Sequence, residues 1–424
     1  MILLLLQRFR VVLVVSALFS RGLPAADVAP PLFEELVVWK KHEQAIGSYF
    51  VYGLTVTPRG TVLAFAEARL PSQDPPDTEP HHLALKRSHD GGRTWSDNIL
   101  VEKADGEYWK AHGQDGKREC WANPAAVTDR KSGRVFIFYV LNEGAVGGKN
   151  TQRYTRNFYR TSDDEGVTWS ARVEVTDLLN TKADATANRD ATGDWVKDEH
   201  GFPCDHLGRA FHMPGPGHGL QLRSGRLLMQ FWNRTALVNR EGKGIPEKSR
   251  RYGLSLLYSD DGGKVWHAGP AFGTELNATE SRIVELDDGR LYLNARTGNG
   301  PSSRRGVIIG MQQGLEWSMP GYDSAMPTYR GVDCGLNVVH DGAQQVLLLS
   351  RCEEPVDRKK LVISSSGDAG QTWAHKLVHP GGASYSDLVV LPDGVVGLLY
   401  RMRKPELPDA EVGFIRFNLS WLRQ

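Results

Sequence analysis

Short runs of branched and aromatic residues alternate with turn-forming residues along most of the chain. Five pairs of runs stand out: in each pair the first run follows a turn, and a second turn separates it from the second run. The first members of the pairs are residues 60–66, 133–139, 225–231, 289–295 and 345–350, and the second members are residues 83–87, 157–160, 253–258, 307–309 and 361–365. A sixth pair spans residues 394–400 and 411–417. Such runs, bounded by Gly, Asp and Asn, are typical of β-strands, so the pattern predicts six units of paired strands.

An eight-residue segment, Ser-x-Asp-x-Gly-x-x-Trp, follows the second run in four of the units. The copies are residues 88–95, 162–169, 259–266 and 366–373. A degenerate copy at residues 310–317 keeps only the second glycine and the tryptophan. We interpret this box as structural, because Asp accepts hydrogen bonds in turns, Gly adopts unusual dihedral angles and Trp anchors the turn by packing. The repeat indicates an architecture built from similar units.

One unit of this kind cannot bury both faces of its small sheet. A ring of six units removes exposed sheet edges and packs sheet on sheet around an axis. The early run at residues 36–39 could pair with the last unit and close the ring. The sequence therefore predicts an all-β fold, a six-bladed β-propeller, as a single domain over residues 27–424.

Composition and charge narrow the function classes. The chain of 424 residues is 40% hydrophobic, with 11 Trp, 13 Tyr and 14 Phe, which is enough material for a packed core. Lys and Arg number 51 against 50 Asp and Glu, a net charge of +1, so we expect no nucleic-acid partner.

The N-terminus predicts export. Arg8 and Arg10 precede a short apolar stretch at residues 11–19, and small residues at 24–26 offer a cleavage site. We interpret residues 1–26 as a signal peptide and expect a secreted or periplasmic protein. The apolar residues 1–6 leave an uncleaved anchor as the alternative. No later stretch approaches the roughly 20 apolar residues that span a bilayer, so we expect no membrane insertion after cleavage.

The four cysteines are Cys120, Cys204, Cys334 and Cys352. In an oxidising compartment they could form two disulfides with three alternative pairings, or they could be buried thiols. Their spacing matches no zinc motif.

The boxes, together with Tyr52, the strand at residues 60–69, Asn123-Pro124 and the loop 215–219, resemble the sialidase superfamily of proteins with Asp-box (BNR) repeats. The resemblance covers nearly all of the mature chain. It implies a tyrosine nucleophile, a glutamate that activates the tyrosine, an aspartate acid/base and three arginines that grip the substrate carboxylate. It also implies that terminal α-linked sialic acid is the substrate and that no cofactor takes part.

Tyr385 and Glu280 resemble the catalytic pair of that family. Tyr385 stands just before the last pair of strands, and Glu280 precedes the strand that ends in Arg296. A neutral phenol suits attack on an anomeric carbon that carries a carboxylate, and a tyrosine nucleophile is a recognised exception among retaining glycosidases. A phenol with a pKa of about 10 needs a base. Glu285 is the alternative base, although a surface-facing carboxylate is its ordinary interpretation.

Two arginines match the carboxylate clamp by resemblance. These are Arg296 and Arg358, with Arg351 as the alternative to Arg358. Guanidinium groups suit a carboxylate because they bind both oxygens in a fixed geometry. The family has Tyr-Arg-Ile-Pro at the first blade, where we align Tyr52 to Thr55, so Gly53 replaces the first clamp arginine. Arg69 could compensate for this loss.

The acid/base comes from the loop before residue 83. Asp77 best fits the spacing, with Asp74 second, and His82 could have taken the role because histidine titrates near neutrality. Of the other histidines, His206, His212 and His218 surround the 215–219 loop without a zinc spacing, so we expect no metal.

These residues favour an exported retaining exo-glycosidase that releases sialic acid and has a glycan partner. The substitution at Gly53 keeps two alternatives open. The first is a hydrolase or polysaccharide lyase for a different acidic glycan, with His81, His82 or the histidines near the 215–219 loop as base. The second is a propeller that binds glycans without catalysis. The sequence does not predict the oligomeric state.

Overall fold

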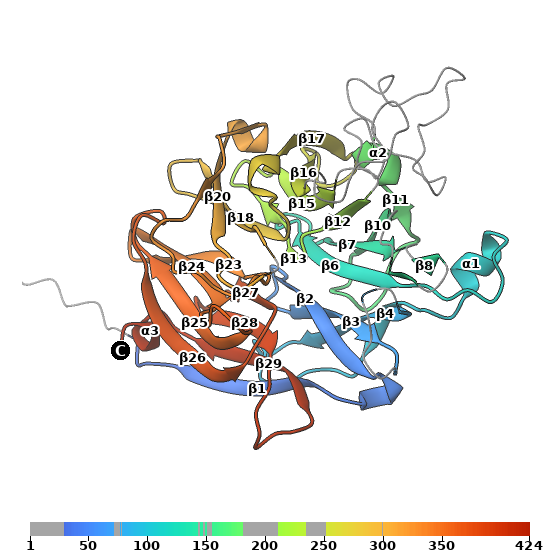
Figure 1. Cartoon of the computed structure of the whole chain (residues 1–424), viewed down its shortest axis with the longest axis horizontal. Helices are drawn as coiled ribbons and strands as arrows, with labels where there is room; N and C mark the ends of the chain where they lie inside the picture. The colour runs from blue at the N-terminus through green and yellow to red at the C-terminus, as the bar shows by residue number, and fades with distance from the viewer. Residues whose placement is uncertain are drawn as a thin grey trace, which may run out of the picture.

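The computed structural model describes residues 29–71, 77, 79–142, 145–146, 149–150, 155–180, 211–234, 252–298 and 300–424. The predicted signal peptide at residues 1–26, Asp74, Cys204 and His206 lie outside these residues. The described part forms six mainly antiparallel sheets arranged around a central axis, which confirms the prediction of a six-bladed β-propeller (Figure 1).

Each blade carries one strand at the axis and further strands toward the rim. Blade 1 contains β2 (Ser48–Val56), β3 (Val62–Arg69), β4 (His81–Ser88) and β5 (Ile99–Glu102). Blade 2 contains β6 (Trp121–Thr128), β7 (Val135–Asn142), β10 (Thr155–Ser162) and β11 (Val173–Glu174), with β13 (Gly217–His218) added in parallel to β6. Blade 3 contains β12 (Phe211–Pro214), β14 (Leu220–Gln221), β15 (Leu227–Arg234), β16 (Tyr252–Ser259) and β17 (His267–Phe272).

The remaining blades follow the same plan. Blade 4 contains β18 (Ser281–Glu285), β19 (Leu291–Arg296), β20 (Arg305–Met311), β21 (Glu316–Trp317) and β22 (Gly321–Tyr322). Blade 5 contains β23 (Leu336–Asp341), β24 (Gln344–Cys352), β25 (Lys359–Ser366) and β26 (Ala374–Gly382). Blade 6 contains β27 (Ser386–Val390), β28 (Val396–Arg401), β29 (Ala410–Phe417) and β1 (Phe33–Lys40). Outside the blades lie the β8–β9 hairpin (Ala145–Val146, Lys149–Asn150) and the short helices α1 (Glu107–Ala111), α2 (Thr176–Asn180), α3 (Leu419–Leu422), η1 (Glu43–Ala45), η4 (Thr274–Leu276) and η5 (Gln312–Gly314).

The ring is closed by strands from the two ends of the described chain. Strand β1 pairs antiparallel with β29, with Phe33 opposite Phe417 and Leu36 opposite Phe414. The blue β1 lies along the red blade 6 in Figure 1. This pairing confirms the prediction that residues 36–39 close the ring, and it covers the outer edge of blade 6.

The Asp boxes lie on the turns between the third and fourth strands of their blades, away from the axis. In the first box, Asp90 accepts hydrogen bonds from the amides of Arg93 and Thr94, both at 2.9 Å. Trp95 packs edge-on against Phe414 of blade 6, with the ring centroids 5.2 Å apart. The box tryptophans therefore bind neighbouring blades together as well as holding their own turns.

The core fills the spaces between adjacent blades. Leu63 and Phe65 of blade 1, for example, share a buried cluster with Ile137 and Tyr139 of blade 2. This packing explains why the strands are apolar on both faces, because each sheet has a neighbour on either side. Among the described residues, no helix is long and apolar enough to cross a membrane.

The described cysteines are buried thiols. Cys120, Cys334 and Cys352 form no disulfide with one another. Cys334 and Cys352, which flank most of β23 and β24, therefore do not staple these two strands.

Candidate active site

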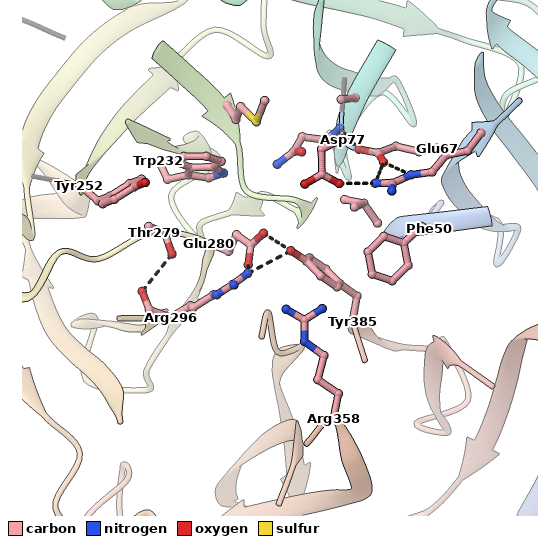
Figure 2. A pocket seen from close by; sticks show the side chains of 15 residues that line it. Phe50, Glu67, Asp77, Trp232, Tyr252, Thr279, Glu280, Arg296, Arg358 and Tyr385 are labelled. Carbon is pink, nitrogen blue, oxygen red and sulfur yellow. Dashed lines mark hydrogen bonds and ion pairs between the residues drawn. The ribbon is translucent and has the colours of Figure 1, made fainter. Parts of the chain in front are cut away.

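A cavity of about 290 Å³ opens at one end of the propeller axis, and all six blades contribute to its lining. Five of its residues stand at or beside strand ends near the axis: Phe50 of β2, Glu280 ahead of β18, Arg296 at the end of β19, Arg358 ahead of β25 and Tyr385 ahead of β27. The side chains of these residues surround the cavity (Figure 2).

Tyr385, Glu280 and Arg296 meet at the centre of the cavity. The Tyr385 hydroxyl donates a short hydrogen bond to Glu280 Oε1. Arg296 Nη1 lies 2.5 Å from Glu280 Oε2 and 3.1 Å from the Tyr385 hydroxyl. Residues 105 positions apart in the sequence thus form a phenol–carboxylate–guanidinium group. Each member is at least 93% buried.

The electrostatics keep the proton on Tyr385. Burial, reinforced by the Glu280 charge, raises the pKa of the Tyr385 phenol well above its ordinary value, while Arg296 and Arg358 oppose the rise. Burial alone would weaken the charge of Arg296, but Glu280 outweighs it and raises the pKa of the Arg296 guanidinium. The phenol can therefore become a nucleophile only by passing its proton to a base, and Glu280 already accepts that hydrogen bond.

Arg358 faces the Tyr385 ring, with its guanidinium carbon 5.8 Å from the ring centroid. Its hydrogen bonds go to two neutral oxygens, Ser384 Oγ and the Gly331 carbonyl, both at 3.2 Å. Within the part of the chain that the structure describes, no carboxylate forms an ion pair with Arg358. Its charge is therefore available to an anionic ligand.

Arg351 and Glu285, the alternatives to Arg358 and Glu280, lie outside the cavity lining. Arg351 is buried inside blade 5, where Nε donates to Ser364 Oγ at 3.2 Å. Glu285 accepts a hydrogen bond from the Arg223 amide at 2.7 Å. Neither residue lines the cavity.

Arg69, Glu67 and Asp77 form a second charged group on the opposite wall of the cavity (Figure 2). Arg69 Nη2 lies 2.6 Å from Glu67 Oε2 and 3.0 Å from Asp77 Oδ1. Burial raises the pKa of the Glu67 carboxyl. The Asp77 side chain lines the cavity and is 63% exposed.

Of the histidines predicted as alternative bases, the four that the structure describes do not line the cavity. His82 Nδ1 accepts a hydrogen bond from the Ala104 amide at 2.8 Å, and His81 is fully buried beside Cys120. His212 is buried in β12, and His218 contacts Asp387 below the cavity. Among the described residues, no three His, Cys, Asp or Glu side chains are grouped to hold a metal ion.

Comparisons with known proteins identify the family of this chain. The family model described as "BNR repeat-like domain" matches residues 60–398, which is most of the chain. The chain belongs to the sialidase superfamily. Its curated relatives include a sialidase of Micromonospora viridifaciens, 29% identical over 418 residues, which covers 95% of this chain and 56% of the relative. A sialidase of Bacteroides fragilis is 26% identical over 376 residues, with coverage of 83% and 60%. The chain thus spans a little over half the length of these relatives.

Solved structures of sialidases share the fold of this superfamily member. The Hadza microbial sialidase Hz136 superposes with a TM-score of 0.68 at 21% identity, which covers 89% of this chain and 66% of the other. The intramolecular trans-sialidase from Ruminococcus gnavus gives a TM-score of 0.65 at 19% identity, with coverage of 90% and 96%.

In this sialidase-superfamily chain Gly53 does not line the cavity, whereas another residue of β2 does. Phe50 lines the cavity and packs edge-on against Tyr385, with the centroids 5.0 Å apart. Gly53 lies deeper along β2, where a Cβ atom would stand 2.8 Å from the Gly217 carbonyl oxygen. The placement of the substitution at Gly53 is therefore wrong. A β-bulge at Val51, which has a φ of 51°, shifts the alternation of β2 and turns Phe50 toward the cavity.

Sequence reasoning missed other residues of the cavity, among them Glu67, Met213 and Trp232. Glu67 lies within a strand that reads as plain core, and Met213 and Trp232 come from blade 3. Trp232 Nε1 is buried without a hydrogen-bond partner among the described residues, so it can donate to a ligand. The signal for Phe50 was present, because Tyr49 starts a segment that also aligns with the Tyr-Arg-Ile-Pro motif.

Proposed function

We propose that this protein is an exported retaining exo-glycosidase of the sialidase type, which hydrolyses terminal α-linked sialic acid through a tyrosyl-enzyme intermediate. The observation that carries the proposal is the contact of Tyr385 with Glu280, with Arg296 bonded to both. A nucleophile, its base and a group that orients the base are in hydrogen-bond reach before any substrate binds. The names of the sialidase relatives support the substrate class.

The geometry suggests how the first half of the reaction proceeds. Glu280 takes the phenolic proton while Tyr385 Oη bonds to the anomeric carbon, and the glycosidic bond breaks. Asp77 gives its proton to the departing glycosidic oxygen. Arg296 loses part of its pairing as Glu280 becomes neutral, so its guanidinium can turn its charge toward the substrate carboxylate together with Arg358.

The second half reverses these proton movements. Asp77, now a carboxylate, takes a proton from a water molecule whose oxygen attacks the anomeric carbon. The bond to Tyr385 Oη breaks, and Glu280 returns the proton to the phenolate. Two inversions at the same carbon retain its configuration, as in other two-step glycosidases.

One observation favours a second candidate function, a hydrolase for a different acidic glycan. Phe50 stands where a third guanidinium would grip a carboxylate, and Arg69, which lies nearby, is paired with Glu67 and Asp77. A clamp of two arginines binds a carboxylate less tightly than a clamp of three, since each charge-assisted hydrogen bond contributes about 1.5–3 kcal/mol. A glycan-binding propeller without catalysis would have no use for the Tyr385–Glu280 contact.

The test is a release assay on α-linked sialosides and a panel of other acidic glycans. Wild type is compared with Tyr385→Phe and with Tyr52→Phe, a matched control whose buried hydroxyl donates to the Tyr49 carbonyl and whose side chain does not line the cavity. We expect sialic acid release that Tyr385→Phe abolishes and Tyr52→Phe keeps. Release of another sugar alone would move the substrate to the second candidate, and full activity in Tyr385→Phe would refute the mechanism. The mass of the mature N-terminus tests cleavage after residue 26.

A further inference from the structure

A buried charged residue stands two positions beyond each member of the Tyr385–Glu280 pair. Arg282 is the second residue of β18, and Asp387 is the second residue of β27. Side chains two apart in a strand point to the same side, so each charge lies behind its partner of the pair. Both side chains are 0% exposed and neither lines the cavity, so neither can touch a substrate.

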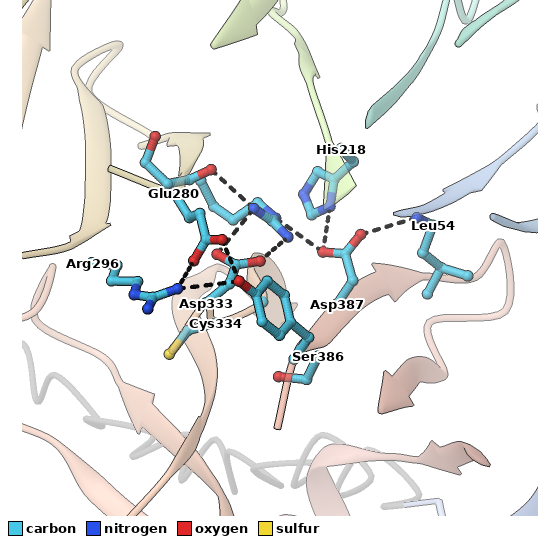
Figure 3. Close-up of polar contacts among 12 residues, drawn as sticks. Leu54, His218, Glu280, Arg296, Asp333, Cys334, Ser386 and Asp387 are labelled. Carbon is cyan, nitrogen blue, oxygen red and sulfur yellow. Dashed lines mark hydrogen bonds and ion pairs between the residues drawn. The ribbon is translucent and has the colours of Figure 1, made fainter. Parts of the chain in front are cut away.

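Arg282 and Asp387 are joined directly below the cavity. Arg282 Nε lies 3.1 Å from Asp387 Oδ1, and Arg282 Nη2 lies 2.7 Å from Asp333 Oδ2. Asp387 Oδ1 is also 2.8 Å from His218 Nδ1, while Oδ2 accepts a hydrogen bond from the Leu54 amide at 3.0 Å. Figure 3 shows Glu280, Asp333, Asp387 and His218 gathered at this point. We call Arg282, Asp387, Asp333 and His218 the axial network. It links β18 and β27 with the chain ahead of β23, with β13 and, through Leu54, with β2.

The 215–219 loop is shaped to lie on this network. Gly217 has a φ of 104°, and a Cβ atom there would stand 2.0 Å from Arg282 Nη2. Only glycine lets the backbone approach the guanidinium so closely. This contact accounts for the glycine-rich loop that the sequence resemblance singled out, and it leaves the Arg282 side chain no room to move.

Arg282 and Asp387 are ionised, whereas burial raises the pKa of the Asp333 carboxyl to about 7. Burial opposes the charge of Arg282, but Asp333 and Asp387 outweigh it and raise the pKa of Arg282. Burial also opposes the charge of Asp387, yet His218 and Arg282 lower its pKa below the ordinary value. Buried ion pairs are poor sources of stability, because the ions lose their hydration, but their directional bonds can hold one geometry.

We propose that the Arg282–Asp387 ion pair, supported by Asp333 and His218, is a positioning element that holds Tyr385 and Glu280 in contact. The ion pair fixes the position of β18 relative to β27 along the propeller axis. Glu280 and Tyr385, which stand just ahead of these strands, therefore meet. This inference rests on the proposed function for the roles of Tyr385 and Glu280, although the contact itself does not depend on activity.

The test uses Arg282→Gln and Asp387→Asn, which preserve size and remove one charge each. For sialoside hydrolysis we expect kcat to fall about 100-fold with KM within twofold, since a misplacement of about 1 Å costs this much. In a Tyr385→Phe background the same substitutions should cost nothing further, because a positioning residue acts only through the residue that it positions. Crystal structures of both variants should show the Tyr385–Glu280 hydrogen bond broken.

Arg416→Gln is the matched control. Arg416 is equally buried, pairs with Glu34 and lies in β29, away from the axis. We expect this variant to keep its kcat. Unchanged kcat in both test variants would overturn the proposal. Unfolding of both test variants, while Arg416→Gln folds, would also overturn it, because the axial network would then serve stability alone. If wild type hydrolyses no sialoside, the proposed function fails separately, and the crystal structures still decide whether the ion pair holds Tyr385 against Glu280.

Discussion

Replacing Arg358 with glutamine should weaken the binding of a carboxylate ligand and leave the contact between Tyr385 and Glu280, the proposed catalytic pair, in place. The Arg358 guanidinium donates hydrogen bonds to two neutral oxygens, Ser384 Oγ and the Gly331 carbonyl, and no carboxylate among the described residues forms an ion pair with it. Arg296 differs, because its guanidinium is shared with Glu280 and Tyr385. The Arg358 substitution therefore separates ligand binding from nucleophile activation.

The magnitude follows from one charge-assisted hydrogen bond. Such a bond contributes about 1.5–3 kcal/mol, which corresponds to about 10- to 150-fold in affinity. Arg358 is only partly buried, and water screens part of its charge. We therefore expect the lower part of that range, about 10- to 50-fold, as a rise in KM with kcat changed less than threefold.

The assay compares the inhibition constants of sialic acid and of its methyl ester, which lacks the charge. Arg358→Gln should lose affinity for the acid and little for the ester. Lys360→Gln removes a nearby exposed charge that does not line the cavity, and it should leave both constants unchanged. An equal loss for acid and ester, or no loss for either, would refute the assignment of Arg358 to the carboxylate.

Four further predictions concern other parts of the molecule. Glu280→Gln removes the base and should lower kcat about 10²- to 10⁴-fold, measured at the pH optimum of wild type. Phe50→Arg restores a guanidinium beside the substrate and should lower the KM for sialosides about tenfold, whereas a raised KM would mean that the cavity is adapted to another sugar. Burial opposes ionisation of Asp90, but its turn hydrogen bonds outweigh this effect and lower its pKa to about 2. The stabilising effect of the Asp90 charge is therefore complete above the ordinary pKa of 3.8 and is lost as the pH falls toward 2. Between these pH values, the melting temperature of Asp90→Asn should fall less steeply than that of wild type. Gly217→Ala should destabilise the fold by more than about 2 kcal/mol in chemical denaturation, because its Cβ would overlap Arg282.

The fold could be predicted from the sequence because its signals are local and repeated. A glycine turn, a pair of strand runs and an Asp box lie close together within one blade, and the same order recurs from blade to blade. The four Asp boxes show how many residues separate one blade from the next. The closing strand was also predictable, since residues 36–39 form a strand-like run that no other unit uses.

The site was predictable only in part. Tyr385 and Glu280 came from family resemblance, since no physical argument brings together residues 105 positions apart. Phe50 was missed because the Tyr-Arg-Ile-Pro motif was aligned at Tyr52 instead of Tyr49. The hydrophobic pattern of β2 could not correct this, since the bulge at Val51 leaves no mark in it. Arg282 was missed for another reason: a charged residue in a strand reads as solvent-exposed, and its burial depends on carboxylates from two other blades.

The pairing of β1 with β29 has a consequence for how this protein comes to be folded. Phe33 and Phe417 are opposite each other in the sheet, so blade 6 needs segments almost 400 residues apart in the chain. Contacts of such long sequence separation form late, because a large loop must close first. During synthesis the growing chain can build blades 1 to 5 in order, but Tyr385 belongs to the blade that closes last. Catalytic competence should therefore appear only at the final step of folding, and a chain that ends before β29 should carry most of the propeller without any activity.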